Sequence, residues 1–458
     1  MLKELPDATV TVKGIPDYVW KLVERERAGQ SRDKAAQTLA EMEARIPPTL
    51  FQKLRPFQRD GIQSAILKGG RVLIGDEMGL GKTVQALGLC SFFRPAWPVL
   101  IICPSSLRLT WAAEIQRWLE LEPYRVQVLM TAKDVPDPFK EIVIVSYDLC
   151  SRAPLSGILT KTKYQIIVAD ECHYLKSRDA KRTKTIVPMI KASQYAIMLS
   201  GTPALSRPME LYTQVTALVK LAFPSMGQYG QRYCDAKMTH FGMDYSGSSH
   251  LGELYWFLEK CVMIRRLKKN VLKELPPKTR QCIYLAALGQ DGGSGGLNDP
   301  RFMELYMMTG VAKIPAVIEY LRDVFHNTDK KFLVFAHHIE VLNALSKFVE
   351  TDLKVGYIRI DGSTPAAQRQ ELCDRFQTRE DVRVAVLGIV AAGVGLTLHR
   401  ADLVIFAELF WTPAQLMQAE DRAHRLGRQS HVDIKYILAK GTLDDRQWPL
   451  IQSKLEVI

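Results

Sequence analysis

The chain has 458 residues, of which 47% are hydrophobic, and its 61 lysines and arginines against 49 acidic residues give a net charge of +12. This length accommodates two or three domains with full cores; without any run of roughly 18 apolar residues, or a basic and then apolar N-terminal segment, we expect neither membrane spans nor a secretory signal. The positive charge favours a polyanionic partner, and the scattered cysteines, without a Cys-x-x-Cys pair, argue against zinc ribbons and disulfide frameworks.

Short apolar runs recur along most of the chain. Residues 1–50 contain no clear series of them, and Ser31–Arg45 predicts a short charged helix. From residue 51 onward the runs alternate with helical patterns, which is typical of parallel sheets built from βαβ units. The runs lie at 72–75, 99–103, 141–146, 165–169, 196–199, 332–336, 356–360, 382–389, 402–407 and 433–439. Because a long, mostly helical stretch separates two groups of runs, we predict an α/β protein with two lobes joined by a helical insert.

These patterns also set domain boundaries. The predicted domains are an N-terminal extension that is partly helical (1–50), a first lobe (51–205), a helical insert and linker (206–325), a second lobe (326–440) and a C-terminal tail (441–458). Within the insert, Gly292–Gly296 has the composition of a flexible linker. We interpret 291–296 as an engineered replacement for a natural disordered segment, with a natural Gly-rich loop as the alternative.

A Gly-rich turn at 76–83, Asp-Glu-Met-Gly-Leu-Gly-Lys-Thr, follows the first apolar run and precedes a helical pattern. This is the context of a phosphate-binding loop, in which backbone N–H groups surround the phosphates, Lys82 reaches the outer ones and Thr83 offers its hydroxyl to Mg²⁺. The strict pattern has Gly where this chain has Asp76. The candidate phosphate-binding residues are Gly79, Gly81, Lys82 and Thr83.

Two adjacent carboxylates, Asp170 and Glu171, end the apolar run at 165–169. Hydrolysis of a nucleoside triphosphate needs such a pair, with Asp170 holding Mg²⁺ and Glu171 orienting and deprotonating the attacking water. An acidic turn after a strand is the alternative interpretation, but the two signatures occur in the order that such a hydrolase requires. A third junction of strand and small-residue turn follows at Ser200–Pro203.

Basic residues cluster at three further places. Arg422 and Arg425 lie three residues apart, so they share one face if their segment is helical, and arginine suits the charge that builds on a γ-phosphate. A charged surface helix is the alternative. The clusters Lys176–Lys184 and Arg265–Lys269 are candidate phosphate contacts or solvated helix faces. We interpret Val262–Lys268 as a brace between lobes, a duplex contact or a packing scaffold.

Together these motifs resemble those of the superfamily 2 helicase-like ATPases, and within them the Swi/Snf-type DNA translocases. The resemblance covers residues 51 to about 450, and its blocks follow the family's order. The blocks are 54–58, 76–83, 104–111, 170–173, 200–203, 335–338, 361–364, 391–397 and 418–427. The segments 232–237, 244–253 and 406–411 resemble the annealing helicases, the HARP-type, fork-remodelling branch.

The resemblance implies two RecA-like lobes that bind ATP and Mg²⁺ between them, with Gln58 reading the adenine. The implied catalytic residues are Lys82, Asp170, Glu171, Arg422 and Arg425, with Thr83 and Asp170 on the metal. The implied contacts to DNA phosphates are Ser105, Ser106, Ser363, Thr364 and Thr397. The implied activity is ATP-dependent tracking along duplex DNA, which rewinds separated strands and reverses stalled forks.

The implied partners are duplex and forked DNA, with single-strand-binding protein bound through regions outside this chain. A monomer in the nucleus is expected. Two positions depart from the family pattern: Cys172 stands where the family usually has Ser, and Arg428 precedes Gln429 where Gln usually comes next. The Cys172 change is conservative, whereas Arg428 is placed outside the catalytic set. The upstream recognition domains of annealing helicases are not visible, so fork selectivity stays open.

Three other functions are alternatives. An RNA-dependent helicase of the same superfamily is disfavoured by the block at 104–111 and by the long helical insert. An ATP-gated DNA scaffold without turnover is disfavoured because Lys82, Glu171, Arg422 and Arg425 are all present. A helicase that separates strands would need a wedge element, and the sequence shows no obvious one.

Overall fold

The computed structural model describes residues 16–17, 19–20, 23–24, 32–201, 207–219, 222–240, 242–272, 278–285, 301–392, 396–424, 428 and 430–457. The chain divides into two compact units, Met1–Glu77 with Gly81–Arg266, and Met78–Leu80 with Leu267–Ile458. The stretch interpreted as an insert, 206–325, therefore contributes its residues up to Arg266 to the first unit and the later ones to the second.

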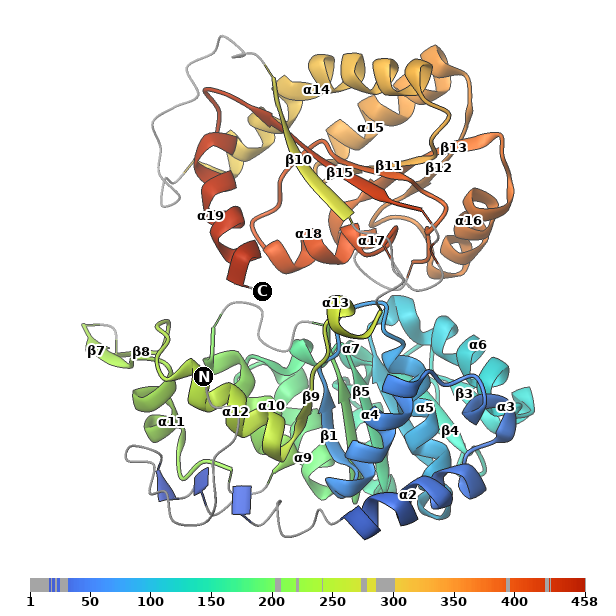
Figure 1. Cartoon of the computed structure of the whole chain (residues 1–458), viewed down its shortest axis with the longest axis vertical. Helices are drawn as coiled ribbons and strands as arrows, with labels where there is room; N and C mark the ends of the chain where they lie inside the picture. Colours follow the sequence, from blue (N-terminus) through green and yellow to red (C-terminus); the bar gives the residue numbers. More distant parts are fainter. Residues whose placement is uncertain are drawn as a thin grey trace. The chain divides into compact units, whose positions relative to one another are not determined.

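The first unit is built on a parallel sheet in the order β3-β4-β2-β5-β6-β1-β9 (Figure 1). Every residue of β2, β4 and β5 is buried, because helices cover both faces, and this explains why these strands are continuous apolar runs. The strands are β1 (Arg71–Ile74), β2 (Val99–Cys103), β3 (Val126–Val128), β4 (Ile142–Ser146), β5 (Ile166–Asp170), β6 (Tyr195–Leu199) and β9 (Met263–Ile264).

The helices of the first unit form a layer on each face of the sheet. One layer contains α4 (Pro56–Leu67), α5 (Lys82–Phe92) and α6 (Arg108–Leu119), and the other contains α7 (Tyr147–Cys150), α9 (Lys181–Ala192) and α10 (Met209–Leu218). The predicted charged helix is confirmed as α2 (Arg32–Arg45). The remaining elements are α3 (Pro48–Phe51), α8 (Leu155–Thr162), α11 (Met226–Tyr233), α12 (Leu251–Cys261) and the antiparallel hairpin of β7 (Lys237–Thr239) and β8 (Gly242–Asp244).

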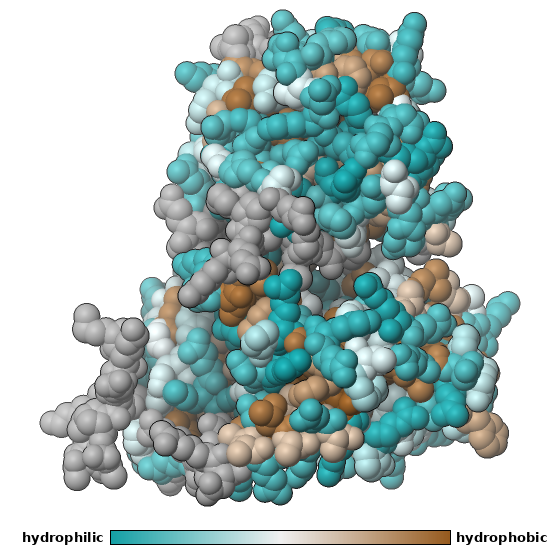
Figure 2. Space-filling view, turned by 45° about the vertical axis from the view of Figure 1, so that its right-hand side comes forward, coloured by the Kyte–Doolittle hydropathy of each residue, from teal (hydrophilic) through white to brown (hydrophobic). Residues whose placement is uncertain are grey.

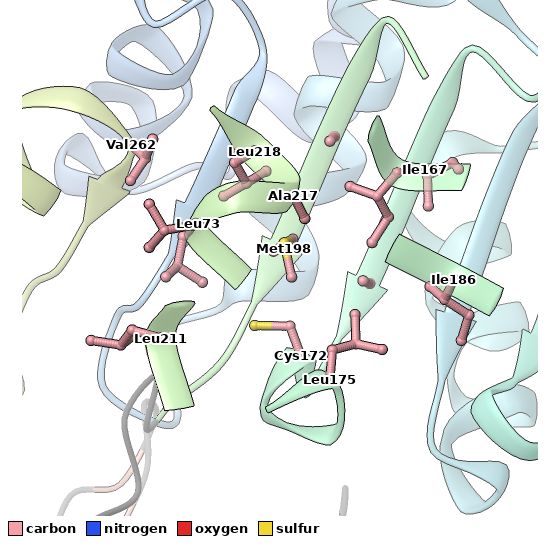
Figure 3. Close-up of a cluster of buried hydrophobic side chains, with 14 of the residues drawn as sticks. Leu73, Ile167, Cys172, Leu175, Ile186, Met198, Leu211, Ala217, Leu218 and Val262 are labelled. Atoms are coloured by element: carbon pink, nitrogen blue, oxygen red, sulfur yellow. The ribbon is translucent and has the colours of Figure 1, made fainter. Parts of the chain in front are cut away.

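A hydrophobic core lies between this sheet and the layer that contains α10. Figure 3 shows Leu73 and Met198 from the strands close to Leu211 of α10, all of them buried. Cys172 lies in the same core, and its Sγ donates to Gln214 Oε1 at 3.0 Å. Burial raises the pKa of this thiol well above its usual value, so it stays protonated and able to donate.

The second unit has its own parallel sheet in the order β10-β15-β14-β11-β13-β12 (Figure 1). Its strands are β10 (Lys278–Leu285), β11 (Phe332–Ala336), β12 (Gly356–Ile360), β13 (Val382–Gly388), β14 (Leu403–Phe406) and β15 (Val432–Ala439). One face packs on α14 (Phe302–Asn327) and α15 (Ile339–Phe348), and the other on α16 (Ala366–Thr378), α18 (Pro413–Glu420) and α19 (Asp444–Val457). The short helices are α13 (Lys268–Val271) and α17 (Ile389–Ala392).

The predicted apolar runs are all strands, but the sequence did not indicate every strand. β10 pairs with β15 over its eight residues, yet it is an edge strand whose residues are exposed or half-buried, and its first four residues are polar. β9 has only two residues and pairs with β1 at the other sheet's edge. Both lie, like β7 and β8, in the stretch 206–325, which was predicted to be mostly helical and which also contains these strands.

On the face that Figure 2 shows, the described residues form a mainly hydrophilic surface with hydrophobic patches between the hydrophilic areas. Among the helices of the described residues, none is both long and apolar enough to cross a membrane. All eight cysteines are free thiols, and only Cys282 is partly exposed.

Candidate nucleotide-binding site

The Gly-rich turn joins the carboxyl end of β1 to α5, which begins at Lys82. Gly79 and Gly81 have φ angles of 83° and 75°, in the left-handed region that favours glycine. A Cβ atom on Gly81 would lie 2.4 Å from Gln58 Nε2, so this position also lacks room for a side chain. The N–H groups at the start of α5 therefore face a turn whose backbone can approach an anion closely, as a phosphate site requires.

Lys82 and Gln58 both lie against this turn. Lys82 Nζ donates to the backbone oxygen of Asp76 at 2.9 Å, so its ammonium group lies across the turn. Gln58 is buried in α4, and its Oε1 accepts the N–H of Arg55 at 3.0 Å, which caps that helix. The structure thus brings Gln58, Gly81 and Lys82 together, while adenine recognition by Gln58 stays a prediction.

Asp76, which departs from the strict loop pattern, has no solvent exposure. Its carboxylate accepts Gln85 Nε2 of α5 at 2.9 Å and Arg266 Nη2 at 2.6 Å. This carboxylate therefore has a structural role that glycine could not fill. Arg266 received no such role from the sequence, because it lies in a basic cluster far along the chain that is equally typical of a solvated surface.

The carboxylate pair ends β5, and Asp170 is buried there. The indole N–H of Trp111 donates to Asp170 Oδ2 at 2.9 Å, the N–H of Glu171 donates to Oδ1 at 2.9 Å, and the Tyr147 hydroxyl donates to the Asp170 carbonyl at 2.7 Å. Burial and then the adjacent Glu171 charge raise the pKa of Asp170 to about 6. Trp111, in the block at 104–111, received no role from the sequence, yet its contact orients the predicted metal ligand.

Glu171 follows in a strained backbone conformation, with φ at 51° in the left-handed region. His173 Nδ1 lies 3.3 Å from Glu171 Oε2 and 3.5 Å from the hydroxyl oxygen of Ser200, which follows β6. A chain of polar side chains thus connects the predicted general base to the third motif. Thr202, the other polar residue of that motif, lies outside the described residues.

A divalent cation fits this site on the chemistry of its donors. Burial, and then the charge of the neighbouring Glu171, raises the pKa of Asp170, and a bound cation would favour its ionised form. Within the described residues, no group of three or more His, Cys, Asp or Glu side chains could hold a metal by itself. Mg²⁺ suits such a sparse oxygen site, because it keeps several waters and takes further ligands from phosphates. Thr83 and Asp170 remain its predicted protein ligands.

The predicted arginines belong to the second unit. Arg422 directly follows the turn after α18 and is buried; its Nε donates to the Gln418 carbonyl at 3.1 Å and its Nη1 to the Leu396 carbonyl at 3.3 Å. Arg425 lies outside the described residues. The catalytic assignment of both arginines stays a prediction.

Arg428, which interrupts the family pattern, is buried within the second unit. Its guanidinium group donates to Asp402 Oδ1 at 2.7 Å and to several backbone carbonyls. Those carbonyls belong to His399, Ala401, Ser430 and His431. The side chain therefore ties the segment before β14 to the segment before β15, which is a structural role.

The predicted DNA contacts follow strand ends in both units. Ser105 and Ser106 lie in the short turn after β2. Ser363 and Thr364 follow β12, where the Ser363 hydroxyl donates to Asp361 Oδ1 at 2.6 Å and the Asp361 N–H donates to Thr364 Oγ1 at 3.0 Å. Thr397 is half-buried in the loop after α17. Their contacts with DNA stay predictions.

Two protein families match the chain: the SNF2-related domain over residues 36–290 and the helicase conserved C-terminal domain over residues 312–427. The SWI/SNF-related matrix-associated actin-dependent regulator of chromatin subfamily A-like protein 1 of Xenopus tropicalis is 45% identical over 434 residues, which are 91% of this chain and 45% of that protein. The DNA annealing helicase and endonuclease ZRANB3 of Mus musculus is 41% identical, with coverage of 90% and 41%. The chain spans about half the length of these relatives. The solved Sulfolobus solfataricus SWI2/SNF2 ATPase core in complex with dsDNA covers 88% of this chain and 92% of its own at 20% identity, with a TM-score of 0.44.

We expect Asp170→Asn to stabilise the nucleotide-free protein above pH 6. Because the folded-state pKa of Asp170 is raised from 3.8 to about 6, the folded protein binds this proton more tightly than the unfolded chain, and the ionised carboxylate destabilises the fold increasingly as the pH rises from about 4 to 6. The expected gain in the free energy of unfolding at pH 8 is on the order of 1–2 kcal/mol. This is less than the pKa shift alone implies, because the amide of Asn offers one hydrogen-bond acceptor fewer than the carboxylate. Urea unfolding at pH 8, 6 and 4 measures it.

The gain should shrink toward pH 4, where the carboxyl is protonated in the folded protein. The control is Asp60→Asn, at an exposed aspartate of α4, which should leave the unfolding midpoint unchanged. A gain that is absent at pH 8, or equal at every pH, would contradict the assignment of strain to this carboxylate.

Proposed function

The chain belongs to the SNF2-related family of helicase-type ATPases, and we propose that it is a DNA-dependent ATPase that translocates on duplex DNA and acts as an annealing helicase. One observation carries the ATPase proposal. The neighbouring strands β5, β6 and β1 end at the carboxylate pair, at Ser200 and at the Gly-rich turn, so one edge of the sheet offers a phosphate cradle and a catalytic acid pair. Ligand sites of open parallel sheets form at this edge.

Each residue of the edge then has a chemical role. Gly79, Gly81 and the first N–H groups of α5 would surround the phosphates, and Lys82 would move from the Asp76 carbonyl to the outer phosphates. Bound Mg²⁺ would neutralise charge that develops on the phosphate oxygens. Asp170 would hold that ion while Glu171 orients and deprotonates the attacking water.

The second unit would supply positive charge for the transition state. Arg422 and Arg425 would stabilise the charge on the γ-phosphoryl group, and hydrolysis would then require both units. This dependence would let each cycle of hydrolysis change how the two units hold DNA. Contacts through Ser and Thr hydroxyls would read phosphates rather than bases, as tracking along any sequence requires.

Annealing activity at forks is proposed from the relatives. One of them is named a DNA annealing helicase, and the similarity covers about nine-tenths of this chain. The net charge of +12 suits a DNA partner. Duplex and forked DNA are the proposed partners of this chain, and single-strand-binding protein would be bound through regions outside it. A monomer in the nucleus is the proposed state.

The test is the steady-state rate of ATP hydrolysis with forked DNA, plain duplex, single-stranded DNA or RNA. Stimulation by DNA, greatest at forks or junctions, would support the whole proposal. Equal stimulation by plain duplex would support a translocase and reject fork selectivity in this chain. Stimulation by RNA alone, or none by any nucleic acid, would overturn the proposal.

Lys82→Ala and Glu171→Gln should separate binding from chemistry. We expect Lys82→Ala to lose both ATP binding and turnover, because the outer phosphates lose their cation. Glu171→Gln should bind ATP with wild-type affinity while turnover falls at least about 100-fold, because the amide cannot accept a proton. Fluorescent-nucleotide binding and phosphate release measure the two properties, with Lys133→Ala at an exposed loop as the control. Normal turnover in either variant would reject the site.

Arg422→Ala should lower turnover with little change in ATP affinity. An arginine that acts on transition-state charge affects kcat more than ground-state binding, and we expect a fall of at least about 100-fold. Because Arg422 is buried, the melting temperature must be measured beside the kinetics, with the exposed Arg400→Ala as the control in the same unit. A large loss of ATP affinity with kcat retained would reassign Arg422 to nucleotide binding.

A further inference from the structure

Beyond Ile264, the last residue of β9, the chain continues to pair with the first unit's sheet as far as Arg266. The N–H of Leu73 donates to the Val262 carbonyl at 2.8 Å, that of Gly75 to Ile264 at 2.7 Å and that of Glu77 to Arg266 at 2.9 Å. These hydrogen bonds come from every second residue, so the parallel pairing of β1 with β9 extends into the start of the Gly-rich turn. The first part of that turn takes its shape from a segment about 190 residues further along the chain.

The Arg266 side chain adds a second attachment to the same turn. The Asp76 carboxylate accepts the backbone N–H of Arg266 at 3.0 Å, its Nε at 3.0 Å and its Nη2 at 2.6 Å, besides Gln85 Nε2. The Asp76 side chain has no exposure and that of Arg266 is 16% exposed. A carboxylate in such a place depends on this partner, because removing one member of a buried ion pair leaves an uncompensated charge.

The guanidinium group occupies a tight space. It lies 5.3 Å from the ring centre of Phe57. A Cβ atom on Gly61 would lie 2.4 Å from Arg266 Nη2 and 2.3 Å from Gln85 Oε1, which in turn accepts Nη2 at 2.7 Å. A planar group with several donors fits here, and a lysine ammonium would not reproduce its contacts.

Asp76 also connects Arg266 to Lys82. The Asp76 residue that Arg266 fixes by its side chain also holds Lys82 Nζ through its backbone carbonyl, at 2.9 Å. Arg266 is therefore connected to Lys82 through Asp76.

Two residues after Arg266, where the chain has entered the second unit, Lys268 makes a corresponding attachment. Its buried Nζ donates to Asp421 Oδ1 and to the His424 carbonyl, both at 2.8 Å. Asp421 immediately precedes Arg422. Burial alone would raise the pKa of Asp421, but the ammonium groups of Lys268 and Lys278 hold it well below its usual value, so the pair is ionised at neutral pH.

We propose that Ile264–Lys268 is a positioning segment for ATP hydrolysis, in which Arg266 sets the shape of the Gly-rich turn and Lys268 sets the turn that carries Arg422. The proposal rests on the proposed ATPase function. The two side chains serve different groups, so their loss has different consequences. Loss of the Arg266 contact weakens the binding of nucleotide, and loss of the Lys268 contact slows hydrolysis of nucleotide that is already bound. A scaffold that only stabilises the fold would not separate these two effects.

The test compares Arg266→Gln, Lys268→Gln and the control Lys347→Gln, whose exposed side chain lies on α15. We expect Arg266→Gln to raise KM for ATP about tenfold with kcat within about twofold, and Lys268→Gln to lower kcat about tenfold with KM within about twofold. Lys347→Gln should match the wild type. The melting temperature of each variant is measured alongside. Equal changes of kcat and KM in the two variants, or changes that only follow the melting temperature, would overturn the proposal.

A double-mutant cycle tests the Arg266–Asp76 contact itself. Asp76→Asn and Arg266→Gln should each weaken binding of a non-hydrolysable ATP analogue, and the double variant should bind more tightly than additivity predicts, because it leaves no unpaired buried charge. If Arg266→Gln does not fold, Arg266→Lys takes its place, and its KM for ATP should exceed that of the wild type. A KM equal to that of the wild type would overturn the proposal.

These readouts separate the two proposals. If the wild type binds the analogue but shows no hydrolysis with any nucleic acid, the proposed function fails, while the Arg266 part of the inference is still decided by analogue binding. If the wild type hydrolyses ATP with DNA and the variants show no split between KM and kcat, the inference alone fails.

Discussion

A buried carboxylate needs hydrogen-bond donors to compensate its charge, and Asp76 is such a carboxylate at the start of the Gly-rich turn. Gln85 and Arg266 supply them, one from the helix that follows the turn and one from the far end of the unit's chain. The turn, the helix α5 and the edge strand β9 are thereby fixed against each other before any ligand arrives. The positions of Lys82 and Gly81, and with them the proposed phosphate cradle, depend on this single polar centre.

The same edge of the sheet also carries the Asp170 carboxylate, whose ionised form destabilises the fold. Asp170 is buried beside Glu171, and burial with the neighbouring charge raises its pKa, so its ionised form is disfavoured until a cation arrives. Trp111 and Tyr147 hold this residue in place, which prevents the carboxylate from turning away to relieve the repulsion. A carboxylate held in this way would gain more from a cation than a relaxed one would, which suits its proposed role as a metal ligand.

The sequence predicted those parts of the fold that buried strands and local turns determine. Continuous apolar runs located the central strands, and Asp170 and Glu171 lie at a strand end as expected. It could not predict contacts between residues far apart in the chain, because a run such as Arg265–Lys269 looks the same whether it is solvated or paired with buried acids. Nor did it indicate β9 and β10, because the two apolar residues of β9 closely follow the end of α12 and the first half of β10 is polar. Arg428 is a further example, since only its surrounding carbonyls give it a role.

The tight space around the Arg266 guanidinium group restricts which substitutions this protein can accept at Gly61. Gly61 lies in the interior of α4, where glycine costs about 1 kcal/mol relative to alanine, so a methyl group there would ordinarily be a stabilising change. The space that the methyl group would need is already filled by Arg266 and Gln85. Replacing Gly61 by alanine is therefore not expected to stabilise this protein, either in evolution or by design. In related sequences that retain the buried pair, positions 61, 76, 85 and 266 should be inherited as one set rather than vary independently.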